Sequence, residues 1–220
     1  GGFSEEGTEY QIRVGKERKL PTVWSNVMAN ETFGTVVTEG MGGYTWYKNS
    51  RLNRLTAWNN SQVTDVPSEI LYLEDLETKK VWSLGSSPAP DNNDYEVTYG
   101  WGYSKYCHSS NGIKQELKIF IPKEENCKVQ LLHLENKVAK RKEIKLVYYM
   151  KPVLDEDEIK SNGYLDLQFK ENANLLLLQN QAKEKEHRTI FAIGCSEKIL
   201  SYPGSKCCSL GKGTLKNPDG

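Results

Sequence analysis

Residues 42–60, with the sequence GGYTWYKNSRLNRLTAWNN, gather aromatic, amide and guanidinium side chains in one short stretch. Aromatic rings bind sugars because the C–H groups on a pyranose face pack against a π surface while the hydroxyls stay hydrated. Asparagine and arginine side chains can then recognise the hydroxyls, since together they offer hydrogen-bond donors and acceptors. The stretch is therefore a candidate carbohydrate-binding surface, with the candidate residues Trp46, Asn49, Arg51, Arg54, Trp58 and Asn60.

A second aromatic stretch, YGWGYSKYCH at residues 99–108, has a similar composition and adds Tyr103 to the candidates. Both stretches have a structural interpretation as well, because strands of a β-sandwich favour aromatic residues in the core and along the edges. Composition alone leaves the binding interpretation and the structural interpretation open.

Catalytic and metal-binding patterns are weak. The segments KEEN, EDLE and DEDE are rich in carboxylates, and a glycosidase needs two carboxyl groups facing each other across a sugar, but acidic turns of this kind are common. No nucleophile elbow occurs, and GKGT at 211–214 lacks the spacing of a phosphate-binding loop. His108 follows Cys107 in a stretch that we expect to be rich in turns, and it has no metal-ligand spacing to His133 or His187. We therefore expect no catalytic set and no metal site within this chain.

The elements that must position these residues are predicted to be strands. Apolar residues alternate with polar ones at 113–121, 127–135 and 144–150, and the polar turns between them predict a three-stranded meander. Further strands are expected at 9–14, 33–38, 69–74, 95–99, 163–169, 174–180 and 188–194. The one helical window, LDEDEIKSNG, is short and polar. The pattern predicts an all-β fold, a large antiparallel sandwich formed by residues 1–220 as a single domain.

The charge balance gives no sign of a nucleic-acid-binding or membrane-binding protein, and the cysteine content argues against an extracellular one. Lys+Arg and Asp+Glu number 29 each, so no net charge attracts nucleic acid or an anionic membrane. No apolar run approaches the roughly 20 residues of a membrane span, and no signal peptide begins the chain. The five cysteines are an odd number without disulfide or metal spacing, which predicts reduced thiols in a cytoplasmic protein. Both ends of the sequence suggest a fragment of a longer chain.

Five segments occur in the order found in one enzyme family: GGFSEEGTEYQI, PTVWSNVMANETFGTVVTEGMGGYTWYKNSRLNRLTAWNN, SEILYLEDLETKKVWS, YGWGYSKYCHSSNGIKQELKIFIP and LHLEN. Together they resemble the N-terminal domain of family 94 of the glycoside hydrolases, formerly glycosyltransferase family 36. Nearly the whole chain is similar, and the block at 33–60 is the most specific part. The resemblance is strongest to cyclic β-1,2-glucan synthases and β-1,2-oligoglucan phosphorylases. Cellobiose phosphorylases are more distant, with ITRYRYN where this chain has LTAWNN.

The resemblance implies a super-sandwich of the galactose mutarotase-like type that precedes a helical linker and an (α/α)6 catalytic barrel. It also implies that an aspartate in the barrel is the general acid and that inorganic phosphate, a co-substrate of the parent enzyme, attacks the anomeric carbon with inversion. No other cofactor is expected. On this basis the chain alone is expected to be a non-catalytic domain. The ending SLGKGTLKNPDG resembles the last sandwich segment of the family but departs from it at Lys212.

The resemblance also bears on the candidate residues and the partners. It implies that the block at 44–60 faces the barrel of the same chain near the sugar subsites. There Arg51 and Arg54 bind a sugar, hold the barrel through buried ion pairs, or do both. The expected ligand is a β-glucan or gluco-oligosaccharide, and a homodimer interface is a further alternative. A stand-alone carbohydrate-binding module and a glycosidase that uses a carboxylate pair of the sandwich remain as rival interpretations. If a synthase module precedes the domain, the parent protein is tethered to a membrane.

Overall fold

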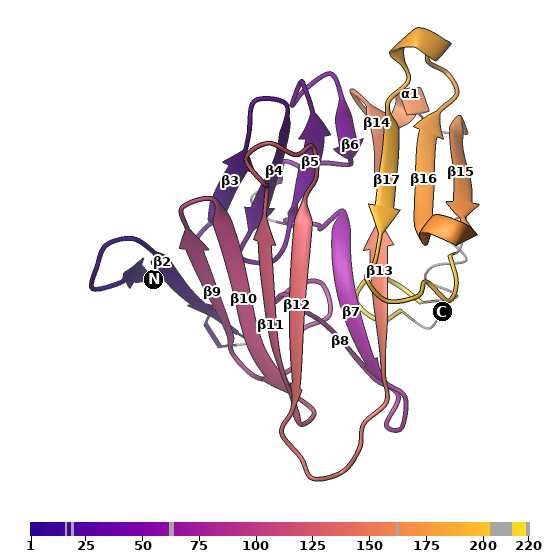
Figure 1. Ribbon diagram of the computed structural model, residues 1–220. Helices are drawn as coiled ribbons and strands as arrows, with labels where there is room; N and C mark the ends of the chain where they lie inside the picture. The colour runs from indigo at the N-terminus through magenta and orange to yellow at the C-terminus, as the bar shows by residue number, and fades with distance from the viewer. Residues whose placement is uncertain (16, 19, 62–63, 162, 203–212, 219–220) are drawn as a thin grey trace.

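The computed structural model describes residues 1–15, 17–18, 20–61, 64–161, 163–202 and 213–218. Almost all regular structure in these residues is antiparallel β-sheet (Figure 1). Helical structure in the described residues is limited to one α-helical turn, α1 (Glu158–Ser161), and two 3₁₀ turns, η1 (Glu171–Ala173) and η2 (Lys185–His187). This confirms the predicted all-β sandwich. Within the described residues, no helix is both long enough and apolar enough to span a bilayer.

The largest sheet has six strands in the order β1-β2-β9-β10-β11-β12. Long hairpins dominate it, because β10 and β11 pair over their full lengths and β11 continues into β12. The bounds are β1 (Gly2–Phe3), β2 (Tyr10–Val14), β9 (Tyr95–Gly100), β10 (Tyr103–Ser110), β11 (Ile113–Phe120) and β12 (Val129–Asn136).

A five-stranded sheet in the order β14-β6-β5-β4-β3 carries the candidate binding stretch. Its strands are β3 (Ser25–Ala29), β4 (Phe33–Thr38), β5 (Gly43–Tyr47), β6 (Arg54–Thr56) and β14 (Pro152–Asp155). Two three-stranded sheets complete the fold, in the orders β13-β7-β8 and β15-β16-β17. Their strands are β7 (Glu69–Asp75), β8 (Lys80–Ser83), β13 (Ile144–Met150), β15 (Leu165–Lys170), β16 (Leu175–Asn180) and β17 (Ile190–Gly194).

The predicted meander of three strands is wrong in its third member. The strands β11 and β12 form the expected hairpin, but β13 pairs with β7 along its whole length, from Ile144 opposite Asp75 to Met150 opposite Glu69. Residues 137–143 carry the chain from one sheet to the other. The prediction failed because alternation shows which residues share a face of a strand and not which strand lies next to it.

The stretch at 99–108 is also more regular than expected. Residues 103–110 form β10, so His108 lies in a strand and not in a turn, and its side chain is buried. The ring of His108 stacks on Tyr95 at a centroid distance of 3.7 Å. Its Nε2 lies 3.0 Å from Oδ1 of Asp91, and its Nδ1 lies 3.0 Å from the carbonyl oxygen of Asp94. These contacts indicate a structural role.

The main core lies between the six-stranded sheet and the sheets opposite it. Inward residues of β10 and β11 such as Tyr106 and Leu117 pack with Met28, Val37 and Leu73. Two buried polar side chains of this core are paired: the indole N–H of Trp82 donates to Gln115, and the Gln115 amide donates to the carbonyl of Leu84. Satisfied donors and acceptors of this kind avoid the desolvation cost of burying polar groups.

Candidate functional site

Strand β5 divides its side chains between the two faces of the five-stranded sheet. Thr45 lies opposite Thr35 and faces the interior, while Tyr44 lies opposite Val36 and Trp46 lies opposite Gly34 on the outer face. The period of two in a strand produces this division. The same strand therefore presents rings outward and a hydroxyl inward.

The outer face carries a compact group of four residues, Tyr44, Trp46, Arg54 and Trp58, which we call the aromatic–arginine cluster. The Tyr44 and Trp58 rings stack with centroids 4.7 Å apart, and Tyr44 and Trp46 lie 5.3 Å apart at a tilt of 38°. The Cζ atom of Arg54 lies 5.6 Å from the centroids of both Tyr44 and Trp58. At this distance the guanidinium attracts both π systems.

Gly34 makes room for the Trp46 ring. A Cβ atom added at Gly34 would lie 2.2 Å from Cζ2 of Trp46, well inside van der Waals contact. The indole therefore lies across the backbone of the neighbouring strand β4, where any other residue would displace it. A glycine within a strand commonly marks such a close approach.

Residues 48–53 form the turn between β5 and β6, and this turn explains why the two arginines differ. The side-chain oxygen of Asn49 accepts hydrogen bonds from the backbone N–H groups of Arg51 and Leu52, which folds the turn. Arg51 is 78% exposed and lies 3.8 Å from Glu156, whereas Arg54 is half-buried and donates from Nε to the carbonyl of Ser50 at 3.4 Å. The chain loops between them, so only Arg54 reaches the rings.

The structure brings together only part of the predicted site. Trp46, Arg54 and Trp58 meet around Tyr44, and Asn49 shapes the adjoining turn. Asn60 is exposed in the loop that follows Trp58. The side chain of Tyr103 lies on the six-stranded sheet, where its hydroxyl donates to Glu9 and the Lys118 ammonium lies 4.3 Å from its ring.

The cluster is more covered than a fully exposed binding surface. Tyr44 is buried, and Trp46, Arg54 and Trp58 are half-buried because they cover one another. Burial raises the pKa of the Tyr44 phenol, although the Arg54 guanidinium acts in the opposite direction. The phenol is therefore uncharged at neutral pH. Beside the cluster, Val27 on β3 is 61% exposed, which extends the apolar part of the same face.

Directly beneath the cluster lies a buried network centred on Glu69 of β7. Its Oε1 accepts hydrogen bonds from the hydroxyls of Thr45 (2.6 Å) and Thr56 (2.9 Å). Its Oε2 accepts from the ammonium of Lys128 and from the hydroxyl of Tyr148 at 2.9 Å. Lys128, immediately before β12, also donates to Thr45 at 2.8 Å. The network thus joins the five-stranded sheet, the six-stranded sheet and the sheet of β7 and β13.

The electrostatics of this network keep the Glu69 carboxylate ionised. The side chains of Glu69 and Lys128 are only 11% and 10% exposed. Burial acts to raise the pKa of Glu69, but the Lys128 ammonium and the hydrogen bonds from Thr45 and Thr56 lower it below its usual value. Burial, together with the adjacent Glu69 carboxylate, raises the pKa of Tyr148 well above its usual value, so Tyr148 remains a donor.

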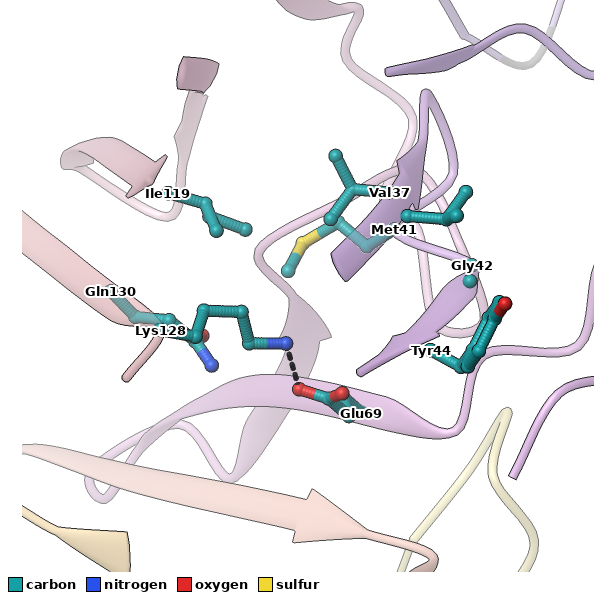
Figure 2. A pocket seen from close by; sticks show the side chains of 10 residues that line it. Val37, Met41, Gly42, Tyr44, Glu69, Ile119, Lys128 and Gln130 are labelled. Atoms are coloured by element: carbon teal, nitrogen blue, oxygen red, sulfur yellow. Dashed lines mark hydrogen bonds and ion pairs between the residues drawn. The ribbon is translucent and has the colours of Figure 1, made fainter. Parts of the chain in front are cut away.

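A small cavity lies beside this pair, with a volume of about 20 Å³. Figure 2 shows the dashed contact between Lys128 and Glu69, with Val37, Met41 and Ile119 on one side and Tyr44 on another. A cavity of this volume accommodates about one water molecule and no sugar.

Two further carboxylates, Glu39 and Asp65, each accept a hydrogen bond from another described residue. Glu39 and Asp65 are partly buried carboxylates whose pKa values are raised mainly by burial. Glu39 accepts from the backbone N–H of Trp24, and Asp65 accepts from the hydroxyl of Thr38. In the described part of the chain, no three His, Cys, Asp or Glu side chains are grouped so as to hold a metal.

Three cysteines, Cys107, Cys127 and Cys195, are free thiols, while Cys207 and Cys208 lie outside the described residues. The first two residues of the GKGT segment, Gly211 and Lys212, lie outside them as well. Burial and the neighbouring Glu116 carboxylate raise the pKa of the Cys107 thiol, which makes it a poor nucleophile at neutral pH.

Sequence reasoning missed Tyr44 as the centre of the cluster and missed the network beneath it. The alternation of β5 could have placed Tyr44 and Trp46 on one face, had residues 43–47 been recognised as a strand. No pattern marks Glu69, because it lies more than ten residues from each of its partners in the chain.

Comparison with known proteins agrees with the fold and the motifs. The profile of the glycosyl hydrolase 94 supersandwich domain matches residues 8–220. The chain is 34% identical over 139 residues to the N,N'-diacetylchitobiose phosphorylase of Vibrio furnissii, covering 62% of this chain and 17% of the relative. It is 25% identical over 181 residues to the cyclic β-(1,2)-glucan synthase NdvB of Rhizobium meliloti (strain 1021), covering 82% of this chain and 6% of that protein.

The solabiose phosphorylase of Paenibacillus borealis is 22% identical over 221 residues, which cover 96% of this chain and 28% of the relative. The chain thus spans less than a third of the length of each of these relatives. Since the family profile covers the sandwich from β2 to the end of the chain, the chain belongs to the glycosyl hydrolase 94 supersandwich domain family.

Proposed function

We propose that this chain is the non-catalytic, carbohydrate-associated domain of a cytoplasmic glycoside phosphorylase or glucan synthase that acts on β-glucans. The observation that carries this proposal is the aromatic–arginine cluster, in which the guanidinium of Arg54 lies over the stacked rings of Tyr44 and Trp58. The relatives named above are a chitobiose phosphorylase, a cyclic glucan synthase and a solabiose phosphorylase, which supports a sugar substrate for the parent enzyme.

The chemistry of the cluster suits a sugar. The half-buried rings of Trp46 and Trp58 offer apolar surface to the C–H face of a pyranose. Arg54 uses Nε for the carbonyl of Ser50, which leaves its terminal N–H groups for a sugar hydroxyl or for a carboxylate of the catalytic barrel. Proton transfer and attack by inorganic phosphate belong in this proposal to the barrel, so the domain supplies position and contact only.

The same face can serve as the surface that packs on the barrel. The exposed Val27 and Arg51 border the cluster, and an exposed group of apolar and arginine side chains is typical of an interaction surface. A homodimer contact through this face is a second way to cover it. In both arrangements the cluster lies at the boundary between the domain and its partner, where a sugar subsite can form.

The test compares the full-length gene product with the 220-residue chain. We expect Trp58→Ala and Arg54→Ala to raise the KM of the full-length enzyme for its oligosaccharide about tenfold or more, which corresponds to a loss of roughly 1.4 kcal/mol or more. Trp101→Ala is the matched control, because Trp101 is 88% exposed at the β9–β10 turn, outside the cluster. Unchanged kinetics in both cluster variants would refute a role in sugar binding.

The alternative is a self-sufficient carbohydrate-binding module, which the stacked rings also favour. It predicts that the 220-residue chain alone binds gluco-oligosaccharides saturably and that Trp58→Ala removes this binding. The accessory domain, in contrast, is expected to bind them only together with the catalytic part. Isothermal titration of β-1,2- and β-1,4-linked gluco-oligosaccharides into the chain distinguishes the two. Release of glucose 1-phosphate from these sugars by the chain alone would contradict both.

A further inference from the structure

The Glu69 network is placed where it can control the shape of the aromatic–arginine cluster. Thr45 is the residue between Tyr44 and Trp46 in β5, and Thr56 lies between Arg54 and Trp58 in the chain. Both hydroxyls donate to the same oxygen of Glu69. One buried carboxylate oxygen therefore holds, from the interior, the two segments that carry all four members of the cluster.

Direct pairing between these two segments is sparse. Strands β5 and β6 share a single pair of opposed residues, Trp46 and Arg54, whereas β4 and β5 share five. The strand on the other side of β6, β14, pairs with an irregular register between Pro152 and Asp155. Backbone hydrogen bonds from Tyr47 to Asn53 and from Ala57 to Lys151 extend this pairing, but the ladder around β6 remains short. Thr56 strengthens it, because its hydroxyl also accepts a hydrogen bond from the backbone N–H of Thr45.

The second carboxylate oxygen of Glu69 bonds to residues of other sheets. It accepts from Lys128, next to β12, and from Tyr148 of β13. Figure 2 shows Lys128 extending across the interior to reach Glu69. Glu69 thereby connects β5 and β6 to strands of two other sheets, which fix the position of β6 relative to β5. A change at Glu69 would let β6 and the loop that follows it shift within the sheet.

We propose that Glu69 is a positioning residue, which fixes the spacing of β5 and β6 and so keeps Arg54 and Trp58 in place against Tyr44 and Trp46. Its hydrogen bonds to this sheet go to Thr45 and Thr56 and not to a member of the cluster, so it acts through these two hydroxyls. The consequence for sugar binding rests on the proposed function, whereas the claim that Glu69 fixes the spacing of β5 and β6 does not. The two parts can therefore be tested separately.

The test uses the 220-residue chain labelled with 5-fluorotryptophan, which gives one ¹⁹F resonance for each of the five tryptophans. Glu69→Gln replaces a two-oxygen acceptor by an amide, so in either orientation of the amide one set of donors loses its acceptor. We expect the resonances of Trp46 and Trp58 to shift or broaden. Those of Trp24 and Trp101 should stay in place. Retention of the buried Trp82 resonance shows that the core is still folded.

Asp75→Asn is the matched control. Asp75 is also a buried carboxylate of β7, paired with Lys142, but its hydrogen bonds go to Lys142 and to the backbone of residues 77 and 78 and not to β5 or β6. It should leave Trp46 and Trp58 unmoved. Thr56→Val should reproduce the shifts of Glu69→Gln, because valine has nearly the volume of threonine but no hydroxyl. Thr56→Ser keeps the hydroxyl and should give the spectrum of the parent chain.

Unmoved Trp46 and Trp58 resonances in folded Glu69→Gln, or equal shifts in Asp75→Asn, would overturn the proposal. If Glu69→Gln fails to fold, the comparison of Thr56→Val with Thr56→Ser decides in its place. If the rings move but oligosaccharide KM in the full-length protein is unchanged, the positioning role stands and the sugar-binding role of the cluster is refuted.

Discussion

Removing the positive partner of the buried pair gives the sharpest prediction about stability. Lys128→Met keeps the length of the side chain but leaves the Glu69 carboxylate with the hydroxyls of Thr45, Thr56 and Tyr148 and no opposite charge. Breaking a buried ion pair by removing one partner costs about 3–5 kcal/mol. Three remaining hydrogen bonds place the cost at the lower end, about 3 kcal/mol at pH 7. For a chain of this size the Tm should fall by roughly 6–12 °C.

The pH dependence of this cost has a definite sign. In the parent chain the pKa of Glu69 is lowered, so its contribution is present above the unfolded pKa and is lost as the pH falls through the folded value. Without Lys128, burial dominates and raises the folded pKa, so the folded state prefers the protonated acid. The stability contributed by protonation is then lost as the pH rises through the raised value. The cost of Lys128→Met should therefore be smaller near pH 5 than at pH 7.

The assay is denaturant unfolding followed by tryptophan fluorescence at both pH values, with thermal melting alongside. Lys140→Met is the matched control, because Lys140 pairs with Glu77 at the surface, where the two side chains are 69% and 53% exposed. It should cost less than about 1 kcal/mol. A cost for Lys128→Met no larger than that of the control, or one that grows as the pH falls, would refute the argument that Glu69 depends on a buried countercharge.

Three further outcomes follow from single contacts. Gly34→Ala should expel the Trp46 indole from the sheet face, because the new Cβ would lie 2.2 Å from the ring, and a red-shifted fluorescence with a change in near-UV circular dichroism would report it. Arg54→Ala should lower the free energy of unfolding of the chain by about 1 kcal/mol, read from denaturant unfolding, since a half-exposed cation–π contact contributes about that much. The hydrogen bond from Lys142 lowers the pKa of Asp75 to about 2, so the stability that this carboxylate contributes is lost as the pH falls from about 4 to that value. In Asp75→Asn, acid unfolding should therefore show a smaller decrease in stability over this pH range.

The fold class could be predicted from the sequence because alternation is a local property. The hairpin of β11 and β12 was predicted at nearly its observed bounds, since apolar residues such as Ile113, Leu117 and Ile119 mark one buried face. The short strands β5 and β6 were not predicted. Strand β5 has the sequence GYTWY, with aromatic residues on both faces and the polar Thr45 at the centre of the inner face, so no apolar–polar alternation marks it as a strand.

The candidate site was predictable in composition but not in arrangement. Arg51 and Arg54 lie three residues apart, and only the turn at 48–53, held by Asn49, decides that Arg54 meets the rings while Arg51 lies near Glu156. The stack of Tyr44 and Trp58 spans 14 residues, and neither spacing nor composition indicates that such residues meet. Their meeting depends on the tertiary placement of β6 against β5.

Strand β5 also connects the two faces of the sheet, because Tyr44 and Trp46 lie on the outer face and the Thr45 hydroxyl lies on the inner face. On the inner face, the Thr45 hydroxyl is held by hydrogen bonds with Glu69, Lys128 and Thr35. A charged, directional anchor fixes the register of a strand more strictly than an apolar contact, because a shift of one residue would replace the hydroxyl at Glu69 with an aromatic ring. Replacing Glu69 and Lys128 together by Leu and Met should therefore recover much of the stability lost in either single variant, as is common for buried pairs. It should not recover the positions of the Trp46 and Trp58 rings. Recovery of the ring positions along with the stability would mean that packing alone defines the outer face.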